Sequence, residues 1–150
     1  MSLLDSWSQG THTADGVTHS TYRKGTGPGV VLIHELPGMT AEVIAYGESL
    51  VDAGYTVMMP HLFGNVPASM ASIVTALPMV CVSKEFNKLA VGVTSPIATW
   101  LRSLARELHG ELGGPGVGAL GMCFTGGFAL AMMVDDSVAA PVLCQPSAPF

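Results

Sequence analysis

The stretch from Gly121 to Gly127 reads GMCFTGG, and it stands between a strand-like apolar run, VGAL at 117–120, and a helix-like run, FALAMMV at 128–134. A strand that turns sharply into a helix lifts the residue at the turn clear of the sheet, and the N-terminus of the helix directs backbone N–H groups toward it. The dipole of that helix would favour a thiolate at Cys123. The pattern therefore predicts that Cys123 is a nucleophile at a strand-to-helix turn.

Strands alternate with helices on both sides of this turn. Apolar runs predict buried strands at 30–35, at 55–59 with Pro60 ending the strand, at 117–120 and at 138–143. Helices are predicted from the N-cap Thr40 to Gly54, from Ser95-Pro96 to Gly110, and after Cys123. Trp100 falls on the apolar face of the second helix and is expected in the core. This alternation predicts an α/β fold with a mostly parallel, doubly wound sheet.

Two other segments complete this organisation. The segment from Thr11 to Arg23 alternates weakly around Asp15-Gly16, which predicts a hairpin that forms an antiparallel edge at the N-terminal side of the sheet. Between His61 and Ser95 the pattern is poor and interrupted by prolines. We expect a long crossover there, with one or two short helices, of the kind that covers a substrate.

Composition limits the class of protein. A chain of 150 residues predicts a single domain over 1–150, and 49% hydrophobic against 11% charged residues predicts a large core or a covered interface. A homo-oligomer or a further C-terminal third of the domain would cover the extra apolar surface equally well. The net charge of -5, with six Lys and Arg that form no basic stripe, argues against a nucleic-acid partner.

Three features argue for a cytoplasmic protein. The three cysteines form no C-x-x-C pair, which favours reduced thiols, and the N-terminus MSLLDSWSQG lacks the pattern of a signal peptide. The stretch from Leu112 to Val134 is uncharged and long enough to span a membrane, but seven glycines and Pro115 divide it into turn, strand, turn and helix. We therefore expect no membrane segment.

Polar residues follow the first two buried strands, where a parallel sheet gathers its working groups. His34 and Glu35 close one strand and His61 closes the next. Three motifs thus occur in order: HELPG at 34–38, PHLFG at 60–64 and GMCFTGG at 121–127. Together they resemble the dienelactone hydrolase family, a branch of the α/β-hydrolases with a cysteine nucleophile, from about Gly25 to the last residue.

The resemblance implies a fold, a reaction and a set of roles. The fold would be that of the α/β-hydrolases, and the reaction the hydrolysis of a small ester or lactone through an acyl-enzyme on Cys123. The backbone N–H groups of Leu36 and Phe124 would form the oxyanion hole. Glu35 would hydrogen-bond the thiol and help to deprotonate it. No cofactor is implied. No metal site is expected, since His34-Glu35 starts an H-E-x-x-H motif that Gly38 breaks. No dinucleotide site is expected either, because the glycines at 116–121 match the dinucleotide fingerprint in their letters but precede and span the strand instead of following it.

The sequence departs from the family pattern in two places. Thr125 stands two residues after the nucleophile, where this elbow usually carries glycine, and we expect its Cβ to crowd the packing of strand against helix. The triad order is nucleophile, acid, histidine, yet no histidine follows Cys123, and Asp135 and Asp136 are expected in a solvated loop. We therefore expect a fold that is incomplete at its C-terminus, with the triad Asp and His missing from these residues.

Simpler interpretations remain open for each candidate. His34 and His61 could be structural histidines as well as pocket residues, and Glu35 could form a structural ion pair. Lys84 is a candidate for binding a substrate carboxylate, as is Lys88, although each could be an ordinary surface charge. The chain could also be a non-catalytic α/β-hydrolase scaffold that binds a small ligand or a partner chain, or a thiol redox sensor at Cys123.

Overall fold

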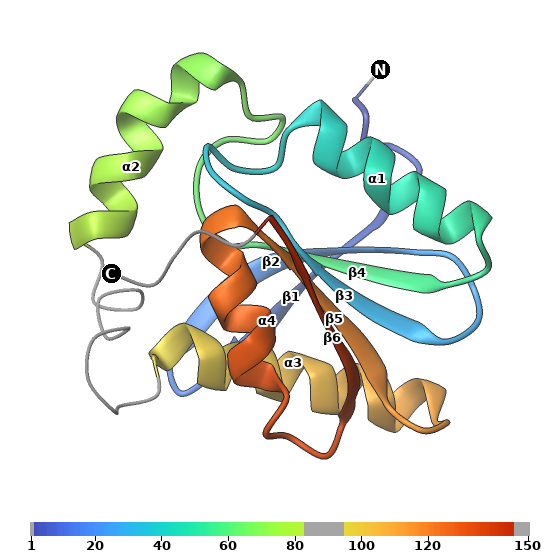
Figure 1. Cartoon of the computed structure of the whole chain (residues 1–150). Helices are drawn as coiled ribbons and strands as arrows, with labels where there is room; N and C mark the ends of the chain where they lie inside the picture. The colour runs from blue at the N-terminus through green and yellow to red at the C-terminus, as the bar shows by residue number, and fades with distance from the viewer. Residues whose placement is uncertain (1, 83–94, 146–150) are drawn as a thin grey trace.

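A six-stranded mixed sheet organises the protein, whose computed structural model describes residues 2–82 and 95–145. The strands lie side by side in the order β1-β2-β4-β3-β5-β6 (Figure 1). They are β1 (Ser8–Ala14), β2 (Val17–Lys24), β3 (Gly29–Ile33), β4 (Thr56–His61), β5 (Val117–Met122) and β6 (Val138–Cys144). The last four pair in parallel, whereas β2 pairs antiparallel with both β1 and β4. The predicted α/β architecture with an antiparallel N-terminal edge is therefore confirmed.

The hairpin between β1 and β2 forms where the sequence predicts it. Asp15 and Gly16 make the turn, with φ angles of 50° and 78°. These left-handed values are those that a two-residue hairpin turn of type I′ requires, and Asp and Gly adopt them more readily than most residues. Ala14 is paired directly with Val17 across the turn. The Asp15-Gly16 dipeptide thus fixes the register of the hairpin.

The strand β4 corrects one predicted boundary. Pro60 was expected to end this strand, but β4 continues to His61, and Pro60 is paired with Thr21 of β2. The pairing of β4 with β3 extends only as far as Met58. Pro60 thus lies where β4 has a neighbour on one side only, and a proline is tolerated at such a position because fewer ladder hydrogen bonds are lost.

Helices cover both faces of the sheet (Figure 1). They are α1 (Ala41–Asp52), α2 (Ile73–Val82), α3 (Pro96–Leu112) and α4 (Gly126–Met132), together with the 3-10 helices η1 (Met70–Ser72) and η2 (Cys123–Thr125). As predicted, Thr40 caps α1, its Oγ1 accepting a hydrogen bond from the N–H of Val43 at 3.3 Å. The predicted end of α3 at Gly110 is wrong, because the helix continues to Leu112 and ends at Gly113, whose φ of 71° suits a helix C-terminus.

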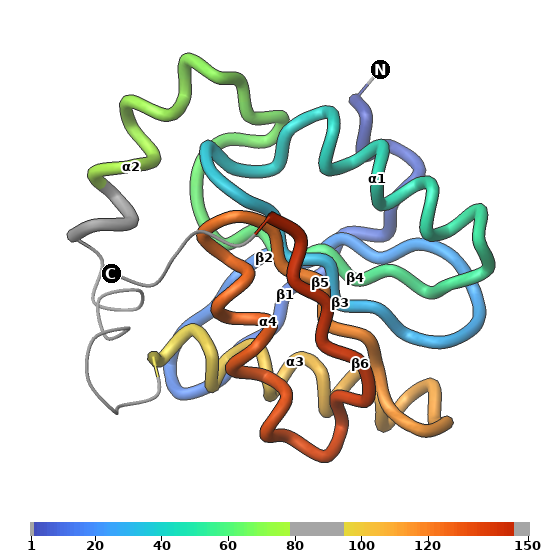
Figure 2. The backbone as a smooth tube through the Cα atoms, in the orientation of Figure 1, coloured from blue at the N-terminus to red at the C-terminus, as the bar shows by residue number. Residues whose placement is uncertain are grey.

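Two core layers hold the helices against the sheet. On one face, α1 and the N-terminal residues Leu4 and Trp7 pack on side chains of the sheet. On the other face, α3 and α4 pack on the opposite side chains of the same strands, and Trp100 is buried there as predicted, with 1% of its surface exposed. Figure 2 traces the chain from β5 through α4 into β6 on this second face. Helices on both faces confirm the doubly wound arrangement.

The crossover after β4 contains η1 and α2, as predicted, within its described part. α2 lies beyond the edge of the sheet at which the parallel strands end (Figure 1). The uncharged stretch 112–134 is divided among the end of α3, β5, η2 and α4. Within residues 2–82 and 95–145, no helix is long and apolar enough to cross a membrane.

Candidate active site

The predicted turn at Cys123 is present between β5 and α4. Cys123 has a φ of 50°, a left-handed value that a residue with a Cβ rarely adopts. The chain enters this residue from β5 in an extended conformation at Met122 and leaves it through η2 into α4. Cys123 is half-buried and forms no disulfide. A strained, left-handed residue between a strand and a helix is the geometry that exposes a nucleophile above a sheet.

Thr125 does not crowd the turn, contrary to the expectation from the sequence. Its side chain is wholly buried, and its Oγ1 lies 3.1 Å from the N–H of Met122, which donates to it. The hydroxyl donates in turn to the carbonyl of Met122 at 2.9 Å. The close approach of helix and strand is provided instead by Gly121, where a Cβ would lie 2.8 Å from the carbonyl carbon of Thr125 and 3.0 Å from the Cβ of Ala129.

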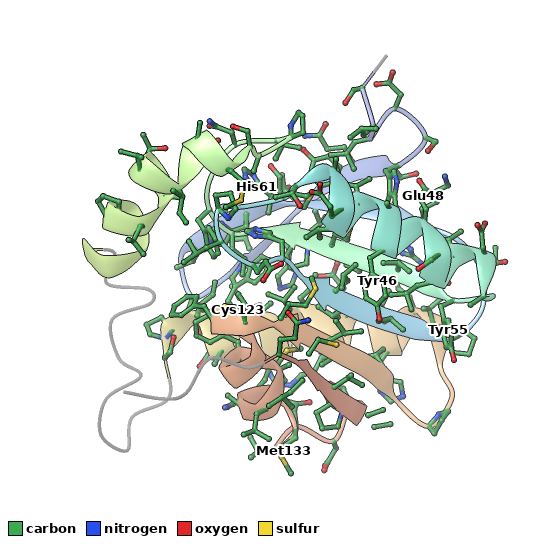
Figure 3. The ribbon with its side chains drawn as sticks, turned by 45° about the horizontal axis from the view of Figure 1, so that its top comes forward. Tyr46, Glu48, Tyr55, His61, Cys123 and Met133 are labelled. Carbon is green, nitrogen blue, oxygen red and sulfur yellow. The ribbon has the colours of Figure 1, made fainter. Side chains whose placement is uncertain are left out.

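The ends of three strands bring the candidate residues to one edge of the sheet. His34, Glu35 and Leu36 follow β3, His61 is the last residue of β4, and Cys123 follows β5. Ile33 at the end of β3 is paired directly with Gly121 of β5. Figure 3 shows His61 and Cys123 at the same end of the sheet. The predicted gathering of these residues at the carboxyl ends of the strands is therefore observed.

The two backbone N–H groups predicted to form an oxyanion hole are both at this edge. Phe124 lies in the first turn of η2, where N–H groups have no partner within the helix. Leu36 lies in the loop after β3, and no acceptor among the described residues takes its N–H. Both N–H groups are thus available to a ligand, and their role as oxyanion donors stays a prediction.

Glu35 is half-buried beside these groups. Within the described part of the chain its carboxylate makes neither a hydrogen bond nor an ion pair, so the predicted bond to the thiol of Cys123 is not formed in this structure. The structural ion pair that was the alternative for Glu35 is not formed with the described residues either. Its part in deprotonating the thiol stays a prediction.

His34 is buried, and both of its ring nitrogens have hydrogen-bond partners. None of its surface is exposed, and the backbone N–H of Leu62 donates to its Nε2 at 3.0 Å. Because Nε2 accepts, the ring proton is on Nδ1, which donates to the carbonyl of Glu35 at 3.2 Å. Phe63 packs edge-on against the ring at a centroid distance of 4.5 Å. These contacts favour the structural alternative for His34, since Nε2 connects the end of β3 to the residue after β4 and Nδ1 bonds the neighbouring Glu35.

Burial sets the protonation of His34. Desolvation lowers the pKa of its imidazole from 6.5 to about 3, against the hydrogen bond to Glu35, which raises it. We expect long-range ¹H–¹⁵N NMR to show a neutral ring with the proton on Nδ1 throughout pH 5 to 8. The unfolded chain takes up this proton near pH 6.5, so the free energy of unfolding should fall by up to about 1.4 kcal/mol per pH unit from there toward pH 3. A ring that is protonated at pH 5.5 would contradict this assignment.

His61 remains a candidate pocket residue. It is half-buried, and its Nε2 donates to the carbonyl of Gly64 at 3.0 Å. Burial lowers the pKa of its imidazole, and the hydrogen bond to Gly64 acts in the opposite direction. Its ring centroid lies 5.9 Å from that of His34. Lys84, the candidate for a substrate carboxylate, lies outside the described residues, as does Lys88.

Asp135 and Asp136 lie far from Cys123, in the loop that leads from α4 to the start of β6. Arg106 forms an ion pair with Asp135 at 2.5 Å. Burial raises the pKa of Asp135, but hydrogen bonds from Ser137 and Arg106 outweigh burial and lower it. A hollow of about 440 Å³ adjoins this loop, and Cys123 is not among the residues that line it. Figure 3 shows neighbouring Met133 at the bottom of the view, away from Cys123 and His61. Neither aspartate can therefore act as the triad acid from this loop.

The hydroxyl of Thr125 is the feature that the sequence analysis missed. Besides closing the turn, it lies 3.4 Å from the carbonyl of Ile33, the last residue of β3. The signal was present, since a threonine just before a helix commonly bonds nearby backbone groups. Among the described residues, no group of three or more His, Cys, Asp or Glu side chains could hold a metal ion.

Comparison with known proteins agrees with this geometry. The model of the dienelactone hydrolase family matches residues 15–149. Among solved structures, the chain is similar to DcsB in complex with its substrate analogue, with a TM-score of 0.67 and 17% identity over 94% of this chain and 45% of that one. No curated protein sequence matches.

Two further solved structures show the same fold. A dienelactone hydrolase-like promiscuous phosphotriesterase from metagenomic libraries has a TM-score of 0.57 and 18% identity, over 84% of this chain and 52% of that one. Epoxide hydrolase A from Mycobacterium thermoresistibile has a TM-score of 0.54 and 22% identity, over 89% of this chain and 37% of that one. The 150 residues thus span about half or less of the length of these proteins.

Proposed function

Because the chain belongs to the dienelactone hydrolase family, we propose that it carries the nucleophile of a hydrolase that acts on small esters or lactones. The observation that supports this proposal is the left-handed Cys123 at the turn from β5 into α4, with the free N–H groups of Leu36 and Phe124 at the same edge of the sheet. An acyl carbon bound there would meet a nucleophile and two oxyanion donors together.

The proposed reaction has two steps. The thiolate of Cys123 adds to the carbonyl carbon, and the negative charge that develops on the carbonyl oxygen is stabilised by the N–H groups of Leu36 and Phe124. The carbonyl then reforms as the alkoxide leaves with a proton, which gives a thioester on Cys123. Water attacks this thioester, releases the acid and restores the thiol. Glu35, half-buried beside these groups, would accept the thiol proton in the first step.

The proton donor and acceptor for the alcohol and for the water would be a histidine held by an acid. No histidine follows Cys123 in this sequence, and Asp135 and Asp136 lie away from the site. We propose that both groups belong to the part of the fold that these 150 residues do not span. The experiments on activity therefore use the protein at its natural length.

A substrate panel tests the proposal. The natural-length protein is assayed with p-nitrophenyl acetate, dihydrocoumarin, styrene oxide and paraoxon, which represent an ester, a lactone, an epoxide and a phosphotriester. We expect turnover of the ester and the lactone, and an acetyl group on the Cys123 peptide when the ester reaction is quenched in acid and examined by mass spectrometry.

Two outcomes would contradict the proposal. Turnover of the epoxide or the phosphotriester alone would place the protein with a different class of hydrolase. Absence of turnover with every substrate, together with an unmodified Cys123, would favour the non-catalytic scaffold.

A further inference from the structure

The hydroxyl of Thr125 connects the two segments that carry the proposed oxyanion donors. It accepts from the N–H of Met122 at 3.1 Å and donates to the carbonyl of the same residue at 2.9 Å, so it closes the turn that contains Cys123 and Phe124. Its oxygen also lies 3.4 Å from the carbonyl of Ile33, three residues before Leu36. One side chain thus contacts both the elbow and the end of β3.

Burial makes these contacts rigid. Thr125 has none of its surface exposed, so no water competes for its hydroxyl. The N–H and the carbonyl of Met122 both bond to this hydroxyl. Without it, these two backbone groups beside Cys123 would each lose a hydrogen bond in a site where an unsatisfied polar group is costly.

We propose that Thr125 is a positioning residue, whose hydroxyl fixes the separation between the N–H groups of Phe124 and Leu36 and thereby the fit of the oxyanion hole to the transition state. The proposal rests on the function given above. A hydrogen-bond donor that moves by about 1 Å loses much of its effect on the rate, because the donors must match the oxyanion and not the ground-state carbonyl.

The contact also explains how this sequence keeps a side chain in a tight turn. The turn needs a close approach between β5 and α4, and Gly121 provides it. Thr125 occupies the N-terminal side of α4 and directs its hydroxyl at the backbone of β5 and β3. Where a glycine would give the turn backbone freedom, Thr125 instead holds the turn with hydrogen bonds.

Two variants separate the hydroxyl from the shape of the side chain. Thr125→Val keeps the shape and removes the hydroxyl, whereas Thr125→Ser keeps the hydroxyl and removes the methyl group. For p-nitrophenyl acetate we expect kcat to fall about tenfold to a hundredfold in Thr125→Val with KM nearly unchanged, and Thr125→Ser to stay within about threefold of the wild type.

A second measurement separates a misplaced oxyanion hole from a collapsed elbow. Alkylation of Cys123 by iodoacetamide attacks an sp³ carbon, generates no oxyanion and does not need the two N–H groups. We expect its rate constant to stay within about threefold of the wild type in both variants. The positioning role predicts that hydrolysis falls in Thr125→Val while alkylation does not.

Three results would overturn the proposal. They are wild-type hydrolysis by Thr125→Val, an equal loss in Thr125→Ser, and a parallel fall of alkylation with hydrolysis. A wild-type protein that hydrolyses no ester would overturn the proposed function and this role with it. If the wild type hydrolyses the ester and Thr125→Val does so equally well, only the positioning role fails.

Discussion

Replacing Cys123 with alanine should lower kcat/KM for ester hydrolysis by at least about a thousandfold in the natural-length protein. The reason is that no other nucleophile described at this edge of the sheet occupies a strand-to-helix turn. The oxyanion donors would remain, so a small residual rate above that of water is expected. The measurement is steady-state hydrolysis of p-nitrophenyl acetate, with folding of the variant checked by circular dichroism and its identity by intact mass.

The matched control is Cys144→Ala. Cys144 is a second half-buried thiol at the end of β6, and it is paired with Met122, one residue before Cys123. Since it lies in an extended strand and not at a turn, its removal should change kcat/KM by less than about twofold. Undiminished turnover in Cys123→Ala, or an equal loss in both variants, would rule out Cys123 as the nucleophile.

Replacing Gly121 with alanine should lower the free energy of unfolding by about 3 kcal/mol. The added Cβ would lie 2.8 Å from the carbonyl carbon of Thr125 and 3.0 Å from the Cβ of Ala129. Neither atom is the end of a flexible side chain, so β5 and α4 would have to move apart. Urea denaturation followed by circular dichroism measures the change, with an unaltered dependence on denaturant.

Gly127→Ala, in the same motif, should change the free energy of unfolding in the opposite direction. Gly127 is exposed in the first turn of α4, and a Cβ there would meet no atom within 4 Å apart from its chain neighbours and the backbone of its own helix. Alanine favours a helix over glycine, so the free energy of unfolding should rise by about 0.5 to 1 kcal/mol. Equal destabilisation by both substitutions would show that the close packing at Gly121 is not what limits this turn.

Short sequence patterns predicted those elements whose conformation is determined by their own residues. The turn Asp15-Gly16 was predictable because few dipeptides adopt two left-handed residues. The strand predicted at 30–35 exists because a strand buried on both faces needs no polar alternation, although β3 ends at Ile33, two residues earlier than expected. The elbow was predictable since a nucleophile between a strand and a helix has a recognisable spacing. In each case the residues that determine the element lie within it.

The expectations that the structure does not support depended on contacts with residues distant in the sequence. Pro60 was expected to end β4, yet whether a strand tolerates proline depends on which neighbours pair with it at that point. His34 was a candidate pocket residue, whereas it is buried and its partner Leu62 directly follows β4. Thr125 was expected to crowd the turn, but its hydroxyl donates to the carbonyl of Met122 and also lies 3.4 Å from the carbonyl of Ile33, on a strand distant in the sequence.

The two tryptophans of the chain lie on opposite faces of the sheet. Trp7 is buried in the layer of α1, where its Nε1 donates to Glu48 at 2.7 Å, and Trp100 is buried in the layer of α3, where its Nε1 donates to the carbonyl of Val17 at 3.1 Å. Each face therefore contains its own intrinsic fluorophore. In the Trp7→Phe and Trp100→Phe variants, the fluorescence of the remaining tryptophan reports the unfolding of the single core layer that contains it. Coincident transitions in the two variants would show that the sheet and the helices on both faces unfold as one cooperative unit.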